Sequence, residues 1–327
     1  MIIGAIKEHN KLETRCTLTP TVVKKLSQLG HKILLEEEIG IKSNFYNDEY
    51  IKAGAILHSK PEKIYTQCQL LLQINPPKAE IINLLSKKQL LISDFSNFDF
   101  STIISTPQIL RLEKVPRLSV AQNIDILSSQ HTIRGYMSAM YALFHSKRIA
   151  PQLITAATSL KPTSALIIGA SITGLQAASV FKRQGCKTTI LDINENNKEL
   201  AQSVGATFAI SNNKDDLISL IQNKNFILAA ASSNNSSPKV INQELLNHLN
   251  SHPVIIDTTQ NNIEISKEKQ TTKNYLFYRN IKFETLAPTT SSELWANNML
   301  YLITLITSTD NQLDLSTDYI ASMLYKG

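Results

Sequence analysis

The segment 165–175, Ala-Leu-Ile-Ile-Gly-Ala-Ser-Ile-Thr-Gly-Leu, carries the clearest chemical signal in the chain. An apolar run ends in a glycine turn and continues into a helical pattern, so the free N–H groups at the helix start are predicted to face a phosphate. The dinucleotide fingerprint G-x-G-x-x-G keeps its first and last glycines here, Gly169 and Gly174, whereas Ser171 occupies the middle position. The hydroxymethyl group of Ser171 is expected either to crowd the phosphate or to donate a hydrogen bond to it.

Asp192 ends the next apolar run, 18 residues after Gly174. An acidic side chain at this place binds the hydroxyl groups of the adenine ribose and repels a 2′-phosphate, which favours NAD(H) over NADP(H). The two segments together predict nucleotide binding. The alternative is a Rossmann-like domain that has lost its ligand.

A second polar set consists of Arg117, Gln122, Asp125 and Ser128, which follow one another at offsets of five, three and three residues. If one helix runs through this segment, the last three side chains lie on adjacent turns of roughly one face. Such a stripe suits a ligand that carries a carboxamide, for example nicotinamide. A solvated helix start has the same pattern, and the stripe by itself favours that interpretation.

The elements that must position these residues form two similar series, in which short apolar strands alternate with amphipathic helices. In the first series we expect strands at 1–6, 32–35, 70–74 and 89–92 and helices at 20–29, 48–53 and 78–85. A long helix at 124–144 leads to a second series, with strands at 165–168, 187–191, 207–210, 226–230 and 253–257 and helices at 174–184, 195–205 and 214–222. We expect a polar loop at 261–273 and a final helix at 292–307.

This alternation predicts the fold class α/β, with two doubly wound Rossmann-like domains joined by a long helix. The first domain is expected to span residues 1–130, with the C-terminal helical segment 290–327 returning to it. The second is expected at 131–289 and carries the glycine turn. We expect the nicotinamide between the two domains.

The composition excludes several classes of protein. With 327 residues, 43% of them hydrophobic and 18% charged, the chain is globular rather than disordered. No apolar run approaches the roughly 18 residues that a membrane span needs. The net charge of +6 is scattered, which does not favour nucleic acid as a partner. Three well-separated cysteines predict neither disulfides nor a metal site, and a start without a signal-peptide pattern predicts a cytoplasmic location.

The stretch 116–129, with the pattern P-R-x-S-x-A-Q-x-x-D-x-L-S-S, resembles a known family. It is similar to the soluble NAD(H)-binding alpha subunit of proton-translocating nicotinamide nucleotide transhydrogenase, which shares its fold with alanine dehydrogenase. Further matches are Lys7-Glu8, Glu13-x-Arg15, Ala53-Gly-Ala55 and the closing segment Ser291–Asn298. The resemblance extends over most of the chain.

The resemblance implies a role for each residue of the two polar segments. Arg117, Gln122, Asp125 and Ser128 fall where the family holds the nicotinamide ring, its carboxamide and the nearby ribose, and they are catalytic in orienting that ring. Further cofactor contacts are implied for Asn123, Ile124, Asp125 and Ile126, for Ile172 in the glycine turn, and for Asp192, Ile193 and Asn194 at the adenosine ribose.

The family also implies the reaction and the partners. Hydride passes directly from NADH to NADP+ on a partner domain, a step that needs positioning but no protein acid or base. The implied partners are a second copy of the chain, an NADP(H)-binding subunit and the membrane subunits that translocate protons. The chain would then work in the cytoplasm, peripheral to the inner membrane.

Several positions depart from the family pattern. Ser171 replaces a glycine, the segment between Ala209 and Phe226 is too short for the family's mobile loop, and 260–263, Gln-Asn-Asn-Ile, stands where a glycine pair usually follows Gln-Asn. The tail after Asp310 is also short. These departures support an alternative, a catalytically weakened NAD-binding or regulatory relative.

An NAD-dependent amino-acid dehydrogenase of the alanine type is the other alternative. Arg15 falls where that branch binds the substrate carboxylate, a role that suits a guanidinium, although we favour a structural ion pair for this residue. Asn75 falls near the branch's substrate lysine, and Phe95-Ser96 falls near its catalytic histidine. Amino-acid oxidation needs a proton acceptor near the amine, so these two replacements count against this alternative.

Overall fold

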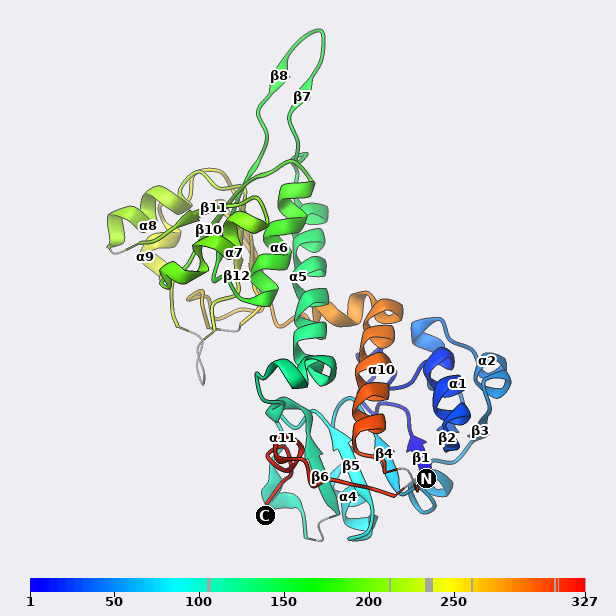
Figure 1. Cartoon of the computed structure of the whole chain (residues 1–327). Helices are drawn as coiled ribbons and strands as arrows, with labels where there is room; N and C mark the ends of the chain where they lie inside the picture. Colours follow the sequence, from blue (N-terminus) through cyan, green and yellow to red (C-terminus); the bar gives the residue numbers. More distant parts are fainter. Residues whose placement is uncertain are drawn as a thin grey trace. The chain divides into compact units, whose positions relative to one another are not determined.

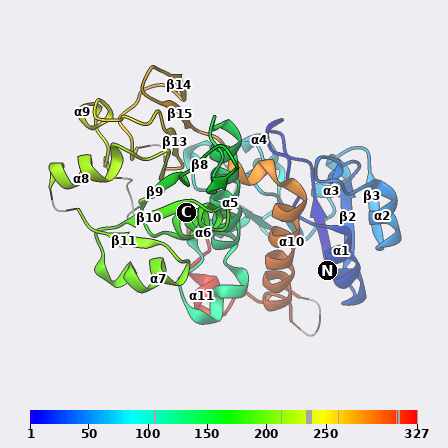
Figure 2. The ribbon, with the colours of Figure 1, turned by 90° about the horizontal axis from the view of Figure 1, so that it is seen from above.

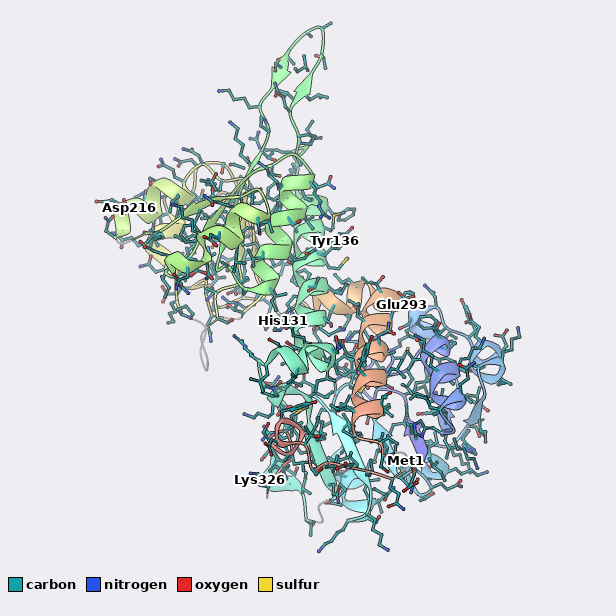
Figure 3. All side chains as sticks on the ribbon, in the orientation of Figure 1. Met1, His131, Tyr136, Asp216, Glu293 and Lys326 are labelled. Atoms are coloured by element: carbon teal, nitrogen blue, oxygen red, sulfur yellow. The ribbon has the colours of Figure 1, made fainter. Side chains whose placement is uncertain are left out.

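The computed structural model describes residues 1–104, 107–211, 213–232, 238–259, 261–308, 310 and 312–326. The chain divides into two compact units (Figure 1), the first made of residues 1–130 and 285–327 and the second of residues 131–284. Helix α5, Ile126–His145, contains the boundary between them. Met1 and Lys326, near the two ends of the chain, both lie in the first unit (Figure 3).

The first unit contains a parallel six-stranded sheet in the order β3-β2-β1-β4-β5-β6. Its strands are β1 Ile2–Ala5, β2 Lys32–Glu36, β3 Ala55–His58, β4 Leu70–Leu72, β5 Leu90–Ser93 and β6 Gln108–Arg111. Its helices are α1 Pro20–Gln28, α2 Asn47–Lys52, α3 Glu62–Tyr65, α4 Ala79–Leu84, α10 Pro288–Leu305 and α11 Asp318–Ala321. The central strands are continuous apolar runs because side chains on both faces of the sheet are buried.

Helix α10 closes the core of this unit. Proline begins the helix at its first turn, where the missing N–H is not needed. Trp295, Met299 and Ile303 recur at helical spacing and are buried in the same cluster as Ile3 of β1 and Leu26 of α1. The final helix, expected at 292–307 within the returning segment 290–327, begins earlier, at Pro288, and ends at Leu305, and the short helix α11 follows at Asp318–Ala321.

The second unit contains a seven-stranded sheet in the order β11-β10-β9-β12-β13-β15-β14, in which β14 runs antiparallel to its neighbour. Its strands are β9 Ser164–Ile168, β10 Lys187–Leu191, β11 Thr207–Ala209, β12 Phe226–Ala229, β13 Val254–Asp257, β14 Lys269–Thr271 and β15 Leu276–Arg279. Its further helices are α6 Ile172–Arg183, α7 Lys198–Ser203, α8 Lys214–Ile221 and α9 Gln243–Leu246. A hairpin of β7 Leu153–Ile154 and β8 Ser159–Leu160 extends away from the body of this unit (Figure 1).

Each sheet has one point at which the order of its parallel strands reverses. In the first unit β1 has β2 on one side and β4 on the other, and in the second unit β9 has β10 on one side and β12 on the other. Figure 2 shows β9, β10 and β11 following one another across the second unit. In open α/β sheets ligands bind outside the carboxyl ends of the strands at such a reversal.

The predicted α/β class with two parallel doubly wound sheets is confirmed, but several elements differ from the prediction. Strands β3, β6, β7, β8 and β15 were not predicted, and β14 lies inside the segment 261–273, which was expected to be a loop. The long helix begins at Ile126 rather than at 124, because Asp125 has a non-helical backbone (ψ 82°). Residues Ser119–Ile124 form a separate 3-10 helix before it.

Helix α5 approaches the first turn of α6 so closely that only glycine fits at position 135. A Cβ atom on Gly135 would lie 2.3 Å from the carbonyl oxygen of Thr173 and 2.9 Å from the Cβ of Gln176. The hydroxyl of Thr173 donates a hydrogen bond to the carbonyl of His131, 3.2 Å away, on the same face of α5. These contacts fix the first turn of α6 against α5.

We therefore expect Gly135→Ala to destabilise the protein by about 2 kcal/mol, because the added methyl group forces the two helices apart. In an uncrowded helix the same change stabilises by up to about 1 kcal/mol, so the sign of the effect is diagnostic. Urea denaturation measures it, with Phe144→Ala, 82% exposed on the same helix, as the control. An unchanged or raised midpoint for Gly135→Ala would contradict the close packing.

Candidate functional site

The turn between β9 and α6 is built around two glycines that admit no side chain. Gly169 has a φ of +95°, and a Cβ there would lie 2.6 Å from the Cα of Ala231, just beyond the end of β12. A Cβ on Gly174 would lie 2.0 Å from the carbonyl oxygen of Gly169. The turn is therefore tight, and it directs the start of α6 at the carboxyl edge of the sheet, at the strand-order reversal.

Ser171 caps helix α6. Its Oγ accepts a hydrogen bond from the N–H of Gly174 (3.2 Å) and donates one to the carbonyl of Ala230 (2.9 Å). The sequence left open whether this side chain would crowd a phosphate or donate to it. In the structure both bonding directions of the hydroxyl are used within the protein.

Asp192 lies at the end of β10 and is tied to the glycine turn. Its carboxylate accepts hydrogen bonds from the N–H of Ala170 (2.6 Å) and of Asn194 (2.9 Å). A carboxylate has about four acceptor positions, so the ribose hydroxyls of a nucleotide could still be bound. Ile193 is 92% exposed, and the side chain of Asn194 is also exposed, as is that of Ile172 on α6.

Asn262, which the sequence marked only as part of a departure from the family pattern, completes this edge of the sheet. Its side-chain amide accepts a hydrogen bond from the N–H of Ala231 (2.9 Å) and donates one to the Ala231 carbonyl (3.0 Å). It donates another to the carbonyl of Pro238, 2.7 Å away, and Asn262 is fully buried. No local sequence motif predicts these hydrogen bonds of Asn262, because they depend on which strands are neighbours in the sheet. Gln260, which belongs to the same predicted departure, lies outside the described residues.

The second polar set lies in the first unit and surrounds a small pocket. The pocket has a volume of about 180 Å³ and is lined by Pro116, Arg117, Leu118, Ser119, Ala121, Gln122 and Asp125. Arg117 and Gln122 are exposed there and can reach a ligand. The structure thus brings three of the four predicted side chains to one pocket, although Gln122 and Ser128 do not share one helix as was expected.

Asp125 and Ser128 interact with each other at the break between the two helices. The carboxylate of Asp125 accepts hydrogen bonds from the N–H and from the hydroxyl of Ser128, which makes Asp125 the cap of α5. Ile124 and Ile126 are buried in the core of the unit, so their predicted contact with a cofactor is limited to the main chain. Asn123 is exposed, and its carbonyl accepts a hydrogen bond from Asn298 (2.7 Å).

Asn298 of α10 was predicted only as part of a closing motif, yet it holds the polar segment in place. Besides binding the carbonyl of Asn123, its side chain accepts a hydrogen bond from the hydroxyl of Ser129 (2.7 Å). The end of the 3-10 helix and the start of α5 are therefore joined to the same residue. Asn298 therefore positions the segment around Asn123 and Ser129, although it is far from both residues in the sequence.

Two domain descriptions from one protein family match nearly the whole chain. The description "Alanine dehydrogenase/PNT, N-terminal domain" matches residues 4–134, and "Alanine dehydrogenase/PNT, C-terminal domain" matches residues 138–326. The chain belongs to the alanine dehydrogenase/PNT family. The resemblance inferred from the sequence is thus confirmed.

Two curated relatives are transhydrogenase subunits. The first section of an NAD(P) transhydrogenase subunit alpha from Rickettsia prowazekii is 30% identical over 228 residues, which are 66% of this chain and 59% of the relative. The NAD(P) transhydrogenase subunit alpha of Haemophilus influenzae is 27% identical over 340 residues, with 94% of this chain and 66% of the relative covered. The chain thus spans about three fifths to two thirds of the length of these relatives.

Two solved structures of the alanine dehydrogenase/PNT fold superpose over nearly the whole chain. The transhydrogenase from Sinorhizobium meliloti has a TM-score of 0.91 at 22% identity and covers 99% of this chain and 98% of its own. An L-alanine dehydrogenase has a TM-score of 0.86 at 21% identity and covers 99% and 94%. At this identity the likeness shows the fold, which both branches share.

Two further findings concern the part of the chain that the structure describes. None of its helices is long and apolar enough to cross a membrane. No three or more of its His, Cys, Asp and Glu side chains are grouped so that they could hold a metal ion.

In this member of the alanine dehydrogenase/PNT family, the strand-order reversal of the first unit is filled by the chain's own side chains. Glu8, after β1, accepts hydrogen bonds from the N–H groups of Ile74 (2.7 Å) and Asn75 (3.1 Å), which follow β4, and from the Asn75 amide (2.9 Å). The same amide donates to Glu13, 3.2 Å away. Burial, together with the charge of Glu13, raises the pKa of Glu8 to about 7, against the opposing effect of these donors.

Arg15 is bound on every side in this network. Its Nε and Nη2 donate to the two carboxylate oxygens of Glu13 (2.7 and 2.8 Å), and Nη1 donates to Gln130 (2.7 Å). Its guanidinium also lies 5.5 Å from the ring centre of Trp295. Burial raises the pKa of Glu13, but the hydrogen bonds and charge of Arg15 outweigh burial and leave it below its ordinary value. Arg15 is therefore a buried structural ion-pair partner.

The capping geometry predicts that Asp125→Ala destabilises the protein by about 1 kcal/mol, because the N–H of Ser128 in the first turn of α5 loses its acceptor. Asp125→Asn retains an acceptor oxygen and should lose much less. Thermal denaturation compares the two variants with the wild type. Equal losses for both would show that the carboxylate charge, rather than the cap, is what matters.

The environment of Glu8 predicts a pH-dependent stability. Its folded pKa of about 7 lies above the ordinary 4.5, so its favourable contribution is complete below about pH 4.5 and is lost as the pH rises through 7. Glu8→Gln removes this titration, and its stability relative to the wild type should therefore improve by roughly 1–3 kcal/mol between pH 5 and pH 8. Urea denaturation at several pH values measures the difference, with exposed Glu37→Gln as the control. A difference that stays constant with pH would refute the assignment.

Proposed function

We propose that the chain is the NAD(H)-binding subunit of a proton-translocating transhydrogenase and presents NADH for hydride transfer to NADP+ on a partner domain. The observation that supports this most strongly is the glycine turn at the strand-order reversal of the second unit, with Asp192 tied to it. The transhydrogenase alpha subunits among its relatives support the choice within the family.

The residues of the second unit fit the adenosine half of a dinucleotide. Gly169 and Gly174 leave room where a side chain would block the turn, and the start of α6 offers N–H groups to the pyrophosphate. The carboxylate of Asp192 would accept the ribose hydroxyls and repel the 2′-phosphate of NADP(H). Ile172, Ile193 and Asn194 are exposed and would contact the same half of the ligand.

The pocket of the first unit fits the nicotinamide end. Gln122 offers an amide that can pair with the carboxamide, and Arg117 offers a guanidinium beside it. Asp125 and Ser128 hold the segment in shape through their mutual hydrogen bonds, with support from Asn298. The bound nicotinamide supplies the hydride and the partner's nicotinamide accepts it, so the chain's contribution is orientation rather than proton transfer.

We further propose that the chain works as a dimer beside NADP(H)-binding and proton-translocating membrane subunits, at the cytoplasmic side of the inner membrane. The relatives named as subunit alpha support the existence of other subunits. The β7–β8 hairpin supports contact with another chain, because Ile154 on it is 72% exposed and Leu153 and Leu160 are exposed as well.

The structure speaks against an alanine-type dehydrogenase. The guanidinium of Arg15 donates hydrogen bonds to Glu13 and Gln130, so these donors are not available to a substrate carboxylate. Asn75 is bound to Glu8 and Glu13 and cannot supply the charge of a lysine. The branch's histidine falls near Phe95-Ser96, and Phe95 is buried and stacks with Phe100.

The proposal predicts saturable binding of NADH and much weaker binding of NADPH, measured by nucleotide fluorescence. Asp192→Ser removes the repelling charge and should reduce the preference for NADH by roughly tenfold. Glu195→Gln, an exposed acidic residue close in sequence, is the control and should leave the preference unchanged. Equal affinity of the wild type for both nucleotides would refute the role of Asp192.

Activity separates the proposal from the dehydrogenase alternative. With the NADP(H)-binding domain of a transhydrogenase added, the chain should transfer hydride from NADH to NADP+. With a 2-oxo acid and ammonia in place of that domain, NADH should not be oxidised. Oxidation in the second assay, or absence of NADH binding, would overturn the proposed function.

A further inference from the structure

Ser171 and Asn262, two residues 91 positions apart in the sequence, act on consecutive residues of the same segment. Ser171 donates a hydrogen bond to the carbonyl of Ala230, and Asn262 binds both the N–H and the carbonyl of Ala231. Ala230 and Ala231 follow β12, the strand across the order reversal from β9. Hydrogen bonds from these two side chains thus hold the main chain of Ala230 and Ala231 beside the glycine turn.

This segment has little freedom to move. Ala231 is packed so closely against Gly169 that a Cβ on the glycine would lie 2.6 Å from it. Asn262 is fully buried, and its third hydrogen bond, to the carbonyl of Pro238, holds its amide in one orientation. The carbonyl of Ala230 therefore presents a fixed acceptor to the hydroxyl of Ser171. That hydroxyl is held in the rotamer in which its oxygen accepts the N–H of Gly174.

The N–H of Gly174 belongs to the first turn of α6, where a pyrophosphate would accept hydrogen bonds. Its present acceptor is the hydroxyl of Ser171, so a phosphate oxygen can use this N–H only by displacing the hydroxyl. The displaced hydroxyl would lose its bond with Gly174 and strain its bond with Ala230. A glycine at position 171 would offer no such competition and would let the main chain approach the phosphate.

We propose that Ser171 sets the affinity for the dinucleotide by competing with its pyrophosphate for the N–H of Gly174, an inference that rests on the proposed NAD(H) binding. Ser171 is in this sense an affinity-determining residue of the turn. The effect is specific for ligands that carry the phosphate groups, because the hydroxyl competes at the phosphate position alone. A site of this kind binds NADH more weakly than one with three glycines and releases it faster.

The experiment compares the full-length wild type with Ser171→Gly and Ser171→Ala, using NADH, ADP and adenosine as ligands in titration calorimetry. Ser171→Gly should bind NADH and ADP about three- to tenfold more tightly, which corresponds to one hydrogen bond recovered by the ligand. Ser171→Ala frees the N–H but keeps a Cβ, so its gain should be smaller. The affinity for adenosine, which has no phosphate, should not change.

Asn242→Gly is the matched control. Asn242 caps α9 in the same unit, accepting the N–H of Leu245 at 2.9 Å, as Ser171 caps α6. Its loss should leave all three affinities unchanged. Circular dichroism of each variant shows that the fold is retained, so that any change in affinity belongs to the turn.

The outcomes separate this inference from the function on which it rests. Tighter NADH and ADP binding by Ser171→Gly with constant adenosine binding supports the inference, also where the wild type binds too weakly to measure. Unchanged or weaker NADH and ADP binding by folded Ser171→Gly overturns it while NADH binding by the wild type stands. An equal gain for adenosine also overturns it, and no binding by any variant overturns the proposed function and this inference together.

Discussion

The carboxyl edge of the second sheet depends on the absence of a side chain at position 169. Gly169 leaves β9 with a positive φ and brings the turn into contact with Ala231, which no Cβ would allow. Because of this contact, the residues that follow β12 pass close to the turn, and the hydroxyl of Ser171 can reach the carbonyl of Ala230. The start of α6 follows this turn directly, and Asp192 is tied to it through the N–H of Ala170.

A buried ion pair holds the other side of this edge. The carboxylate of Asp257, at the end of β13, is fully buried and accepts hydrogen bonds from the N–H groups of Thr259 (2.9 Å) and Ile263 (3.2 Å). Arg279 at the end of β15 donates to it at 2.9 Å. A charge that is removed from water in this way must be paired and fully hydrogen-bonded to be stable. Through its bonds to Thr259 and Ile263, Asp257 fixes the main chain before and after Asn262. The orientation of Asn262 toward Ala231 is a consequence.

The sequence predicted the strands and helices whose pattern is local and missed those whose pattern is not. Strands such as β9 can be recognised in the sequence because both faces of a parallel sheet are covered, which makes the strand a continuous apolar run. Strand β6 has only Ile109 and Leu110 between polar residues, and β14 is an exposed edge strand without an apolar side, so neither stands out. The glycine turn and Asp192 were found because their spacing is local. The bonds of Ser171 to Ala230 and of Arg15 to Gln130 were not, because they require knowledge of which segments are neighbours.

The same topology serves two different purposes in the two units. In both sheets the order of the parallel strands reverses once, which creates a position where ligands bind in such folds. In the first unit this position is occupied by Glu8, Glu13, Arg15 and Asn75, whose charges and amide groups satisfy one another. In the second unit the position is bordered by main-chain N–H groups at the start of α6, by the carboxylate of Asp192 and by the hydroxyl of Ser171. The fold alone predicts a ligand at both reversals, whereas the side chains at the edge of each sheet favour the second.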